Sequence, residues 1–165
     1  MAQPTLKYWS WWNVAPQFAA LAALIALFWV LLPSRRVDEA FLLGAAFYVT
    51  YSFGSRYVLA RSHRAGMRAT SRKDFDTALE AFQKSYEFFS RHAWLDDYRA
   101  LTMMSPSVWS YREMALMNIA SVHVMRKDYA AATKACSKVL DEFPQNEIAK
   151  RTIDMIQSPS MEDEA

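Results

Sequence analysis

The chain has 165 residues and a net charge of +2, which allows one modest domain together with a membrane anchor. Its three glycines, six prolines and long stretches of helical periodicity predict an all-α protein. The near-neutral charge excludes a general basic surface for nucleic acid, and the single cysteine, Cys136, excludes an internal disulfide.

Residues 1–13 carry a cluster of aromatic side chains that includes Trp9, Trp11 and Trp12. Tryptophans beside an apolar run favour the lipid headgroup region, where the ring is buried and the indole N–H stays in water. We therefore expect an interfacial aromatic N-terminus. The alternative is a hydrophobic patch on a soluble domain.

The next segment, Val14 to Leu32, contains 19 residues without a charge. This length suffices for a helix that crosses the hydrocarbon core of a bilayer. A cleaved signal peptide is the rival interpretation, with Lys7 as its basic region. The apolar stretch is long for a signal peptide, however, and it lacks an obvious cleavage site with small residues.

A second apolar segment, Ala40 to Phe53, follows the short polar turn Pro33–Asp38 and extends to about residue 60. It crosses the membrane if Arg56 reaches the interface with its long side chain. The small residues at positions 44–46 suit close packing against the first span. Residues 14–60 are therefore predicted to form a two-helix transmembrane hairpin. A buried helical hairpin in a soluble protein is the alternative.

The orientation of this hairpin follows from the basic residues that flank it. Six basic residues and no acid lie between positions 56 and 73, against two basic residues in the turn before the second span. The positive-inside rule then places both termini in the cytoplasm of a bacterial-type inner membrane. Arg56, Arg61 and Arg64 are expected to contact lipid headgroups, although a solvated helix face explains the same pattern.

Residues 111–144 are predicted to form two helices joined by a tight turn at Arg126–Asp128. Apolar residues recur at three- and four-residue spacing on both sides of the turn. Ser110 and Glu113 form a capping box for the first helix, and Asp128 is a good N-cap for the second. An earlier pair repeats the pattern, because Asp74–Ala78 parallels Asp128–Ala132.

These two pairs resemble the tetratricopeptide repeat, a helix-turn-helix unit of about 34 residues. Ala120 and Ala132 occupy the small positions of the second pair, Tyr129 the aromatic position after the turn, and Pro144 the terminal proline. His123 and Cys136 depart from the family pattern. The resemblance covers about residues 59–157, and Asn146–Gln157 is expected to cap the open end. The alternative is a helical hairpin that mimics the motif through ordinary packing.

The resemblance implies that the inner face of each first helix binds a protein partner. That face carries Met67, Met114, Met117, Asn118, Ser121 and Met125, with His63 and Arg64 beside them. Asn118 falls on an asparagine of the family's carboxylate clamp, but the clamp's lysines are missing. A groove rich in methionine suits an apolar or helical segment better. Alternatively, the methionines contact the inserted segment.

An insert at about residues 90–110 separates the two pairs and contains Trp94, Tyr98, Met103 and Met104. These side chains form either a partner-binding surface or core that covers the short array, and we favour core. Residues 158–165 are expected to be a disordered acidic tail.

The sequence contains no constellation that predicts catalysis, a metal site or a cofactor site. The histidines lie about thirty residues apart, and Cys136 falls on an apolar stripe where thiols are inert. We therefore expect a non-catalytic adaptor or scaffold that binds a protein partner at the cytoplasmic face of the membrane. The alternative is an integral subunit of a multisubunit membrane complex whose transmembrane helices make the functional contacts.

Overall fold

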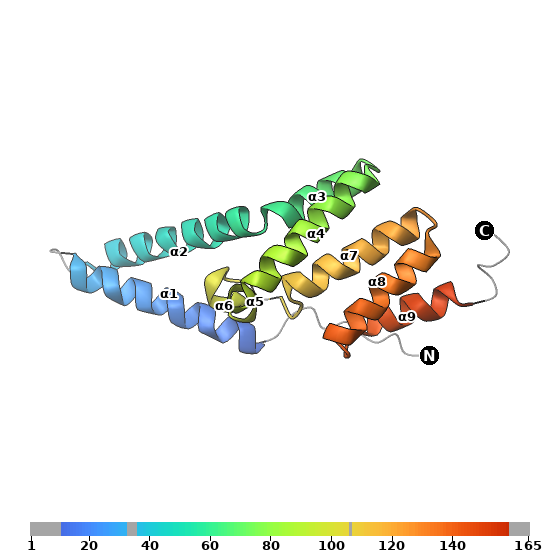
Figure 1. The fold of residues 1–165 in the computed structure, drawn as a ribbon. Helices are drawn as coiled ribbons and strands as arrows, with labels where there is room; N and C mark the ends of the chain where they lie inside the picture. Colours follow the sequence, from blue (N-terminus) through green and yellow to red (C-terminus); the bar gives the residue numbers. More distant parts are fainter. Residues whose placement is uncertain (1–10, 33–35, 106, 159–165) are drawn as a thin grey trace. The chain divides into compact units, whose positions relative to one another are not determined.

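The computed structural model describes residues 11–32, 36–105 and 107–158, and these residues are helical with short connections (Figure 1). The helices are α1 (Trp11–Leu31), α2 (Val37–Leu59), α3 (Arg61–Ser71), α4 (Phe75–Arg91), α5 (Ala93–Asp97), α6 (Arg99–Thr102), α7 (Tyr111–Met125), α8 (Tyr129–Glu142) and α9 (Glu147–Ile156). The predicted all-α class is confirmed. Residues 159–165 of the predicted tail, and Trp9, lie outside the described residues.

The helices form two compact units, which we call the hairpin unit and the stacked unit. The hairpin unit holds the described residues up to Leu59 together with Ala93–Ser110, so it contains α1, α2, α5 and α6. The stacked unit holds Ala60–His92 and the described residues from Tyr111 onward. The insert was expected to belong to the repeat-like domain, but it associates with the N-terminal helices.

In the hairpin unit, α1 and α2 pack along each other as neighbouring helices (Figure 1). Gly44 is buried at this contact, and a Cβ at that position would lie 3.0 Å from backbone atoms of Ile25. The rings of Phe28 and Phe47 meet further along, with centroids 6.3 Å apart. The absence of a side chain at Gly44 therefore allows the two backbones to approach closely.

One described helix is long and apolar enough to cross a membrane, with its candidate span at Val14–Leu31. This property rests on length and composition, which a signal sequence also satisfies. The second helix, α2, has Asp38 and Glu39 in its first turn and Arg56 in its last. The same criterion does not select α2, so the predicted second span is not confirmed.

Large apolar side chains are exposed along both long helices of the hairpin unit. On α1 they include Phe18, Leu27, Val30 and Leu31, and on α2 they include Phe41, Leu42, Phe47, Val49, Phe53, Tyr57 and Val58. Exposed apolar surface of this extent marks an interaction site for protein or lipid.

In the stacked unit, each helix packs on the next in the order α3, α4, α7, α8 and α9. One cluster of buried side chains joins α3, α4 and α7 around Phe82 and Val122. A second cluster joins α7, α8 and α9 around Leu116, Cys136 and Val139. Gly66 of α3 lies against the ring of Phe82, and a Cβ there would come within 2.6 Å of that ring.

The two helix pairs of this unit share the same turn, Arg-Lys-Asp, with the lysines at positions 73 and 127. Both lysines adopt a left-handed conformation, with φ of 59° at Lys73 and 60° at Lys127. The N–H of Asp74 donates to the carbonyl of Ala69 at 3.0 Å, and that of Asp128 donates to His123 at 2.9 Å. These bonds close the Schellman motif that ends many helices. The turns of the two hairpins therefore have the same geometry.

Aspartate caps mark where the second helix of each pair begins, and the cap at Asp128 was predicted. The carboxylate of Asp74 accepts from the N–H of Thr77, and that of Asp128 accepts from Ala131. Asn146 caps α9 in the same way through the N–H of Ala149. The predicted helix pairs, the turn at Arg126–Asp128 and the final helix are confirmed.

Candidate functional site

Two adjoining hollows in the stacked unit form what we call the methionine groove. The larger hollow, of about 670 Å³, is lined by Met67, Thr70, Ser71, Lys73, Phe75 and Met125. The smaller, of about 250 Å³, is lined by Met117, Ala120, Ser121, Val124, Met125, Thr152 and Met155. Met125 lines both hollows, so one surface connects α3, α7 and α9.

Three methionines of this groove present their side chains to solvent. Met67 is 48% exposed, Met125 55% and Met155 49%, whereas Met117 is buried at the base. Methionine is flexible and polarisable, so a surface made of several methionines adapts to apolar partners of different shape. Lys73 adds one exposed positive charge to the lining. The groove is therefore suited to an apolar segment with acidic residues beside it.

The structure brings together four of the six residues predicted for the partner-binding face. Met67, Met117, Ser121 and Met125 line the groove. Met114 and Asn118 are half-buried and line neither hollow. Sequence reasoning missed Phe75 and the α9 pair Thr152 and Met155. No local pattern around that pair indicates the helix against which it lies, so the sequence carried no signal for it.

Asn118 instead lies beside His63 of α3, with its Nδ2 atom 3.5 Å from Nε2 of the histidine. The His63 ring packs edge-on against Phe82 and Tyr111, and its buried Nδ1 atom has no hydrogen-bond partner. This burial lowers the pKa of His63 to about 4, because the charged form would lose its hydration. The histidine is therefore neutral at physiological pH.

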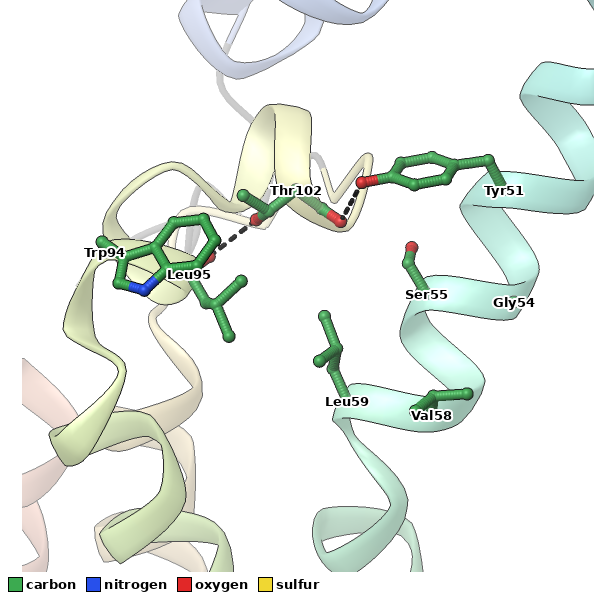
Figure 2. Close-up of a pocket in the computed structure, with 8 residues that line it drawn as sticks. All are labelled: Tyr51, Gly54, Ser55, Val58, Leu59, Trp94, Leu95 and Thr102. Atoms are coloured by element: carbon green, nitrogen blue, oxygen red, sulfur yellow. Dashed lines mark hydrogen bonds between the residues drawn. The ribbon is translucent and has the colours of Figure 1, made fainter.

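A third hollow, which we call the α2–insert groove, lies within the hairpin unit (Figure 2). It has a volume of about 490 Å³ and is lined by Tyr51, Gly54, Ser55, Val58 and Leu59 of α2 and by Trp94, Leu95 and Thr102 of the insert. Figure 2 shows Leu59 and Leu95 directed into the space between the two elements, with the Trp94 ring beside Leu95.

Hydrogen bonds from α2 hold the insert in place around this groove. The Tyr51 hydroxyl donates to the carbonyl of Thr102 at 3.1 Å, and Arg56 Nε donates to the carbonyl of Met103 at 2.8 Å. A second Arg56 nitrogen donates to the carbonyl of Met104. These bonds satisfy carbonyls of irregular backbone, which explains why the insert associates with α2.

The predicted insert residues divide between core and surface. Met103 and Met104 are buried, as the core interpretation requires, whereas Trp94 and Tyr98 are exposed. Among the residues predicted to contact lipid headgroups, Arg56 bonds the insert backbone, Arg61 is exposed and Arg64 is half-buried. Trp11 and Trp12 lie in the first turn of α1.

Two observations concern possible metal-binding and nucleophilic groups in the described part of the chain. No group of three histidine, cysteine, aspartate or glutamate residues lies close enough there to hold a metal ion. Cys136 is fully buried, and this burial raises the pKa of its thiol, which disfavours the reactive thiolate.

Comparison with protein-family models, with curated proteins and with solved structures finds no match to this chain.

Proposed function

We propose that this protein is a non-catalytic, membrane-anchored adaptor that binds the apolar face of a protein partner in its methionine groove. The observation that carries the proposal is the joining of two hollows through Met125, with Met67 and Met155 exposed on either side. A connected surface with several exposed methionines is typical of a site that binds apolar partners.

The repeat-like build of the stacked unit supports a binding role. Its two hairpins have matching Arg-Lys-Asp turns, and the small residues Ala78, Ala120 and Ala132 are fully buried where helices meet. These features agree with a short array of the tetratricopeptide type, capped at one end by α9. Such arrays present the first helix of each pair to a ligand, and the groove lies on α3 and α7.

The composition and exposed surface of the hairpin unit support the proposed membrane anchor. Val14–Leu31 has the length and composition of a membrane span, and the exposed apolar side chains of α1 and α2 are best covered by lipid. With two spans, the basic residues after α2 place both termini in the cytoplasm of a bacterial-type inner membrane. An anchored adaptor raises the effective concentration of a weakly bound partner.

The second candidate is an integral subunit of a membrane complex, in which the anchor itself makes the functional contacts. The exposed residues Phe41, Leu42 and Phe47 of α2 favour this candidate, because other transmembrane helices cover such side chains as well as lipid does.

The first test uses the full-length protein in its native membrane, with a photoreactive phenylalanine analogue at Met67. We expect an adduct with one second polypeptide. The same adduct should disappear when Met125→Glu is added, because a charge in the groove opposes apolar contact, and it should persist with Met125→Leu. An analogue at Lys134, an exposed position on α8, is the matched control.

The results distinguish the two candidates. If the analogue at Met67 captures only this chain, or if Met125→Glu leaves the adduct unchanged, the groove is not the binding site. If an analogue at Phe47 captures a defined polypeptide while Met67 does not, the integral-subunit function replaces the adaptor. Release of the full-length protein from membranes by alkaline carbonate would contradict both.

A further inference from the structure

The α2–insert groove offers an occupant few hydrogen-bonding groups. The hydroxyl of Tyr51 donates to the carbonyl of Thr102, and that of Ser55 donates to Ser52. The Thr102 hydroxyl bonds the carbonyl of Leu95 at 2.7 Å. A polar ligand that entered this space would lose hydrogen bonds to water and find few replacements. The groove therefore selects for hydrocarbon.

The size of the groove limits the kind of hydrocarbon. Its volume of about 490 Å³ lies in the range of small-molecule sites. A helix with its side chains is about 10–12 Å across, so a partner helix would fit only about one turn of its length in this space. A flexible chain without a polar backbone has no such limit.

The groove is continuous with the apolar surface of α2. Gly54 lies in the lining, and a Cβ at this position would meet no atom within 4 Å. Its neighbours Phe53 and Tyr57 are exposed on the same helix, and Val58 is both exposed and part of the lining. A molecule that covers the exposed face of α2 therefore reaches the groove without crossing a polar barrier.

The position of Trp94 indicates the depth at which this molecule lies. Its side chain is 58% exposed at the edge of the groove, and indole rings favour the boundary between headgroups and hydrocarbon. Arg56, a polar side chain of the same helix segment, bonds the insert backbone close by. These two residues are consistent with a groove at the membrane interface.

We propose that the α2–insert groove binds one acyl chain of a membrane phospholipid. This inference rests on the proposed membrane anchor. A bound chain fills the space between Leu59 and Leu95, and it thereby links the insert to the lipid as well as to α2.

The test reconstitutes the full-length protein in phosphatidylcholine vesicles that contain phosphatidylcholine with a diazirine in one acyl chain. After illumination and trypsin digestion, labelled peptides are identified by mass spectrometry. The peptide of residues 92–99 carries Trp94 and Leu95 and reports the groove. The peptide of residues 8–35 carries α1 and reports membrane insertion by itself.

In the wild-type protein both peptides should be labelled. Gly54→Phe places a ring in the open space of the groove, so the label on residues 92–99 should be lost while that on residues 8–35 remains. Ala46→Phe adds the same ring at an exposed position of α2 outside the lining and should leave both labels in place. If Gly54→Phe loses helical content, Gly54→Leu replaces it with the same expected result.

The two peptides separate failure of this inference from failure of the anchor. The acyl-chain site is overturned if the wild-type protein carries label on residues 8–35 but none on residues 92–99. It is also overturned if residues 92–99 are labelled equally in the wild type and in Gly54→Phe. Neither result contradicts the membrane anchor. Absence of label from both peptides contradicts the anchor and the site together.

Discussion

At the scale of single residues, His63 couples the core of the stacked unit to pH. Its ring fills space between Phe82 and Tyr111, and its buried Nδ1 atom has no hydrogen-bond partner. Protonation would place a charge in this apolar setting. For this reason the pKa of His63 is lowered from 6.5 to about 4 in the folded protein.

This lowered pKa makes stability depend on pH in a defined window. Between pH 6.5 and pH 4 the unfolded chain binds a proton at position 63 that the folded chain does not. The contribution of His63 to the free energy of unfolding should therefore fall as the pH falls through this window, by up to roughly 1.4 kcal/mol per pH unit, and this contribution should become constant below pH 4.

The measurement is denaturant unfolding of the detergent-solubilised protein at several pH values between 7 and 4. His63→Gln should flatten the loss of stability, whatever its effect at pH 7. His92→Gln changes an exposed histidine and should retain the wild-type pH dependence. Parallel pH profiles for the wild type and His63→Gln would contradict the assignment.

At the scale of structural elements, the repeated turn determines how each helix pair is closed. Lys73 and Lys127 both adopt the left-handed conformation that glycine accepts without strain. A residue with a Cβ costs about 1–2 kcal/mol in this conformation, so both turns are less stable than they could be.

Lys127→Gly should therefore stabilise the protein, and Lys127→Val should destabilise it, because a β-branched side chain tolerates positive φ poorly. Glycine also has more conformational freedom in the unfolded chain, which lowers the free energy of unfolding by about 0.4–1 kcal/mol. The net increase in the free energy of unfolding should therefore be about 1 kcal/mol or less. Thermal unfolding, followed by circular dichroism, measures the stability of both variants. Lys134→Gly, within α8, is the control of opposite sign and should lose about 1 kcal/mol.

At the scale of the whole molecule, the proposed two-span anchor requires that α2 as well as α1 crosses the membrane. The helix is less apolar than α1 and begins with two acidic residues, yet it exposes apolar side chains along its length. The crossing of α2 determines whether the turn before α2 and the stacked unit lie on opposite sides of the membrane or on the same side.

Two engineered cysteines in a Cys136→Ala background decide this point. Val37 is exposed at the start of α2, and Ser137 is exposed on α8. If both helices cross, a membrane-impermeant maleimide added to intact cells should label Val37→Cys and should label Ser137→Cys only after permeabilisation. Equal labelling of the two positions would contradict the two-span anchor. The wild-type Cys136 should stay unlabelled in the folded protein because it is buried.

The helices themselves could be predicted because their signals are local. Asp74, Asp128 and Asn146 cap helices through bonds to backbone N–H groups three residues away. The three- and four-residue spacing of apolar residues then predicted which faces of α4, α7 and α8 are buried. The groove residues Met67, Met117 and Met125 followed from the family resemblance alone.

The features that could not be predicted from the sequence depend on contacts between segments far apart in the chain. Met155 joins the groove only because α9 packs beside α8, and no pattern near residue 155 predicts the partner helix. Arg56 was expected to reach lipid, but it bonds carbonyls of Met103 and Met104, 47 and 48 residues away.

The sequence by itself therefore determined the helical class, the boundaries of α7, α8 and α9 and the apolar character of the N-terminal segment, because each depends on neighbours within a turn or two of helix. Only the tertiary structure decided that the insert joins α2 and that Gly54 and Trp94 line one groove. The physical reason is that such contacts depend on which side chains and backbone carbonyls remain unsatisfied after the helices have formed.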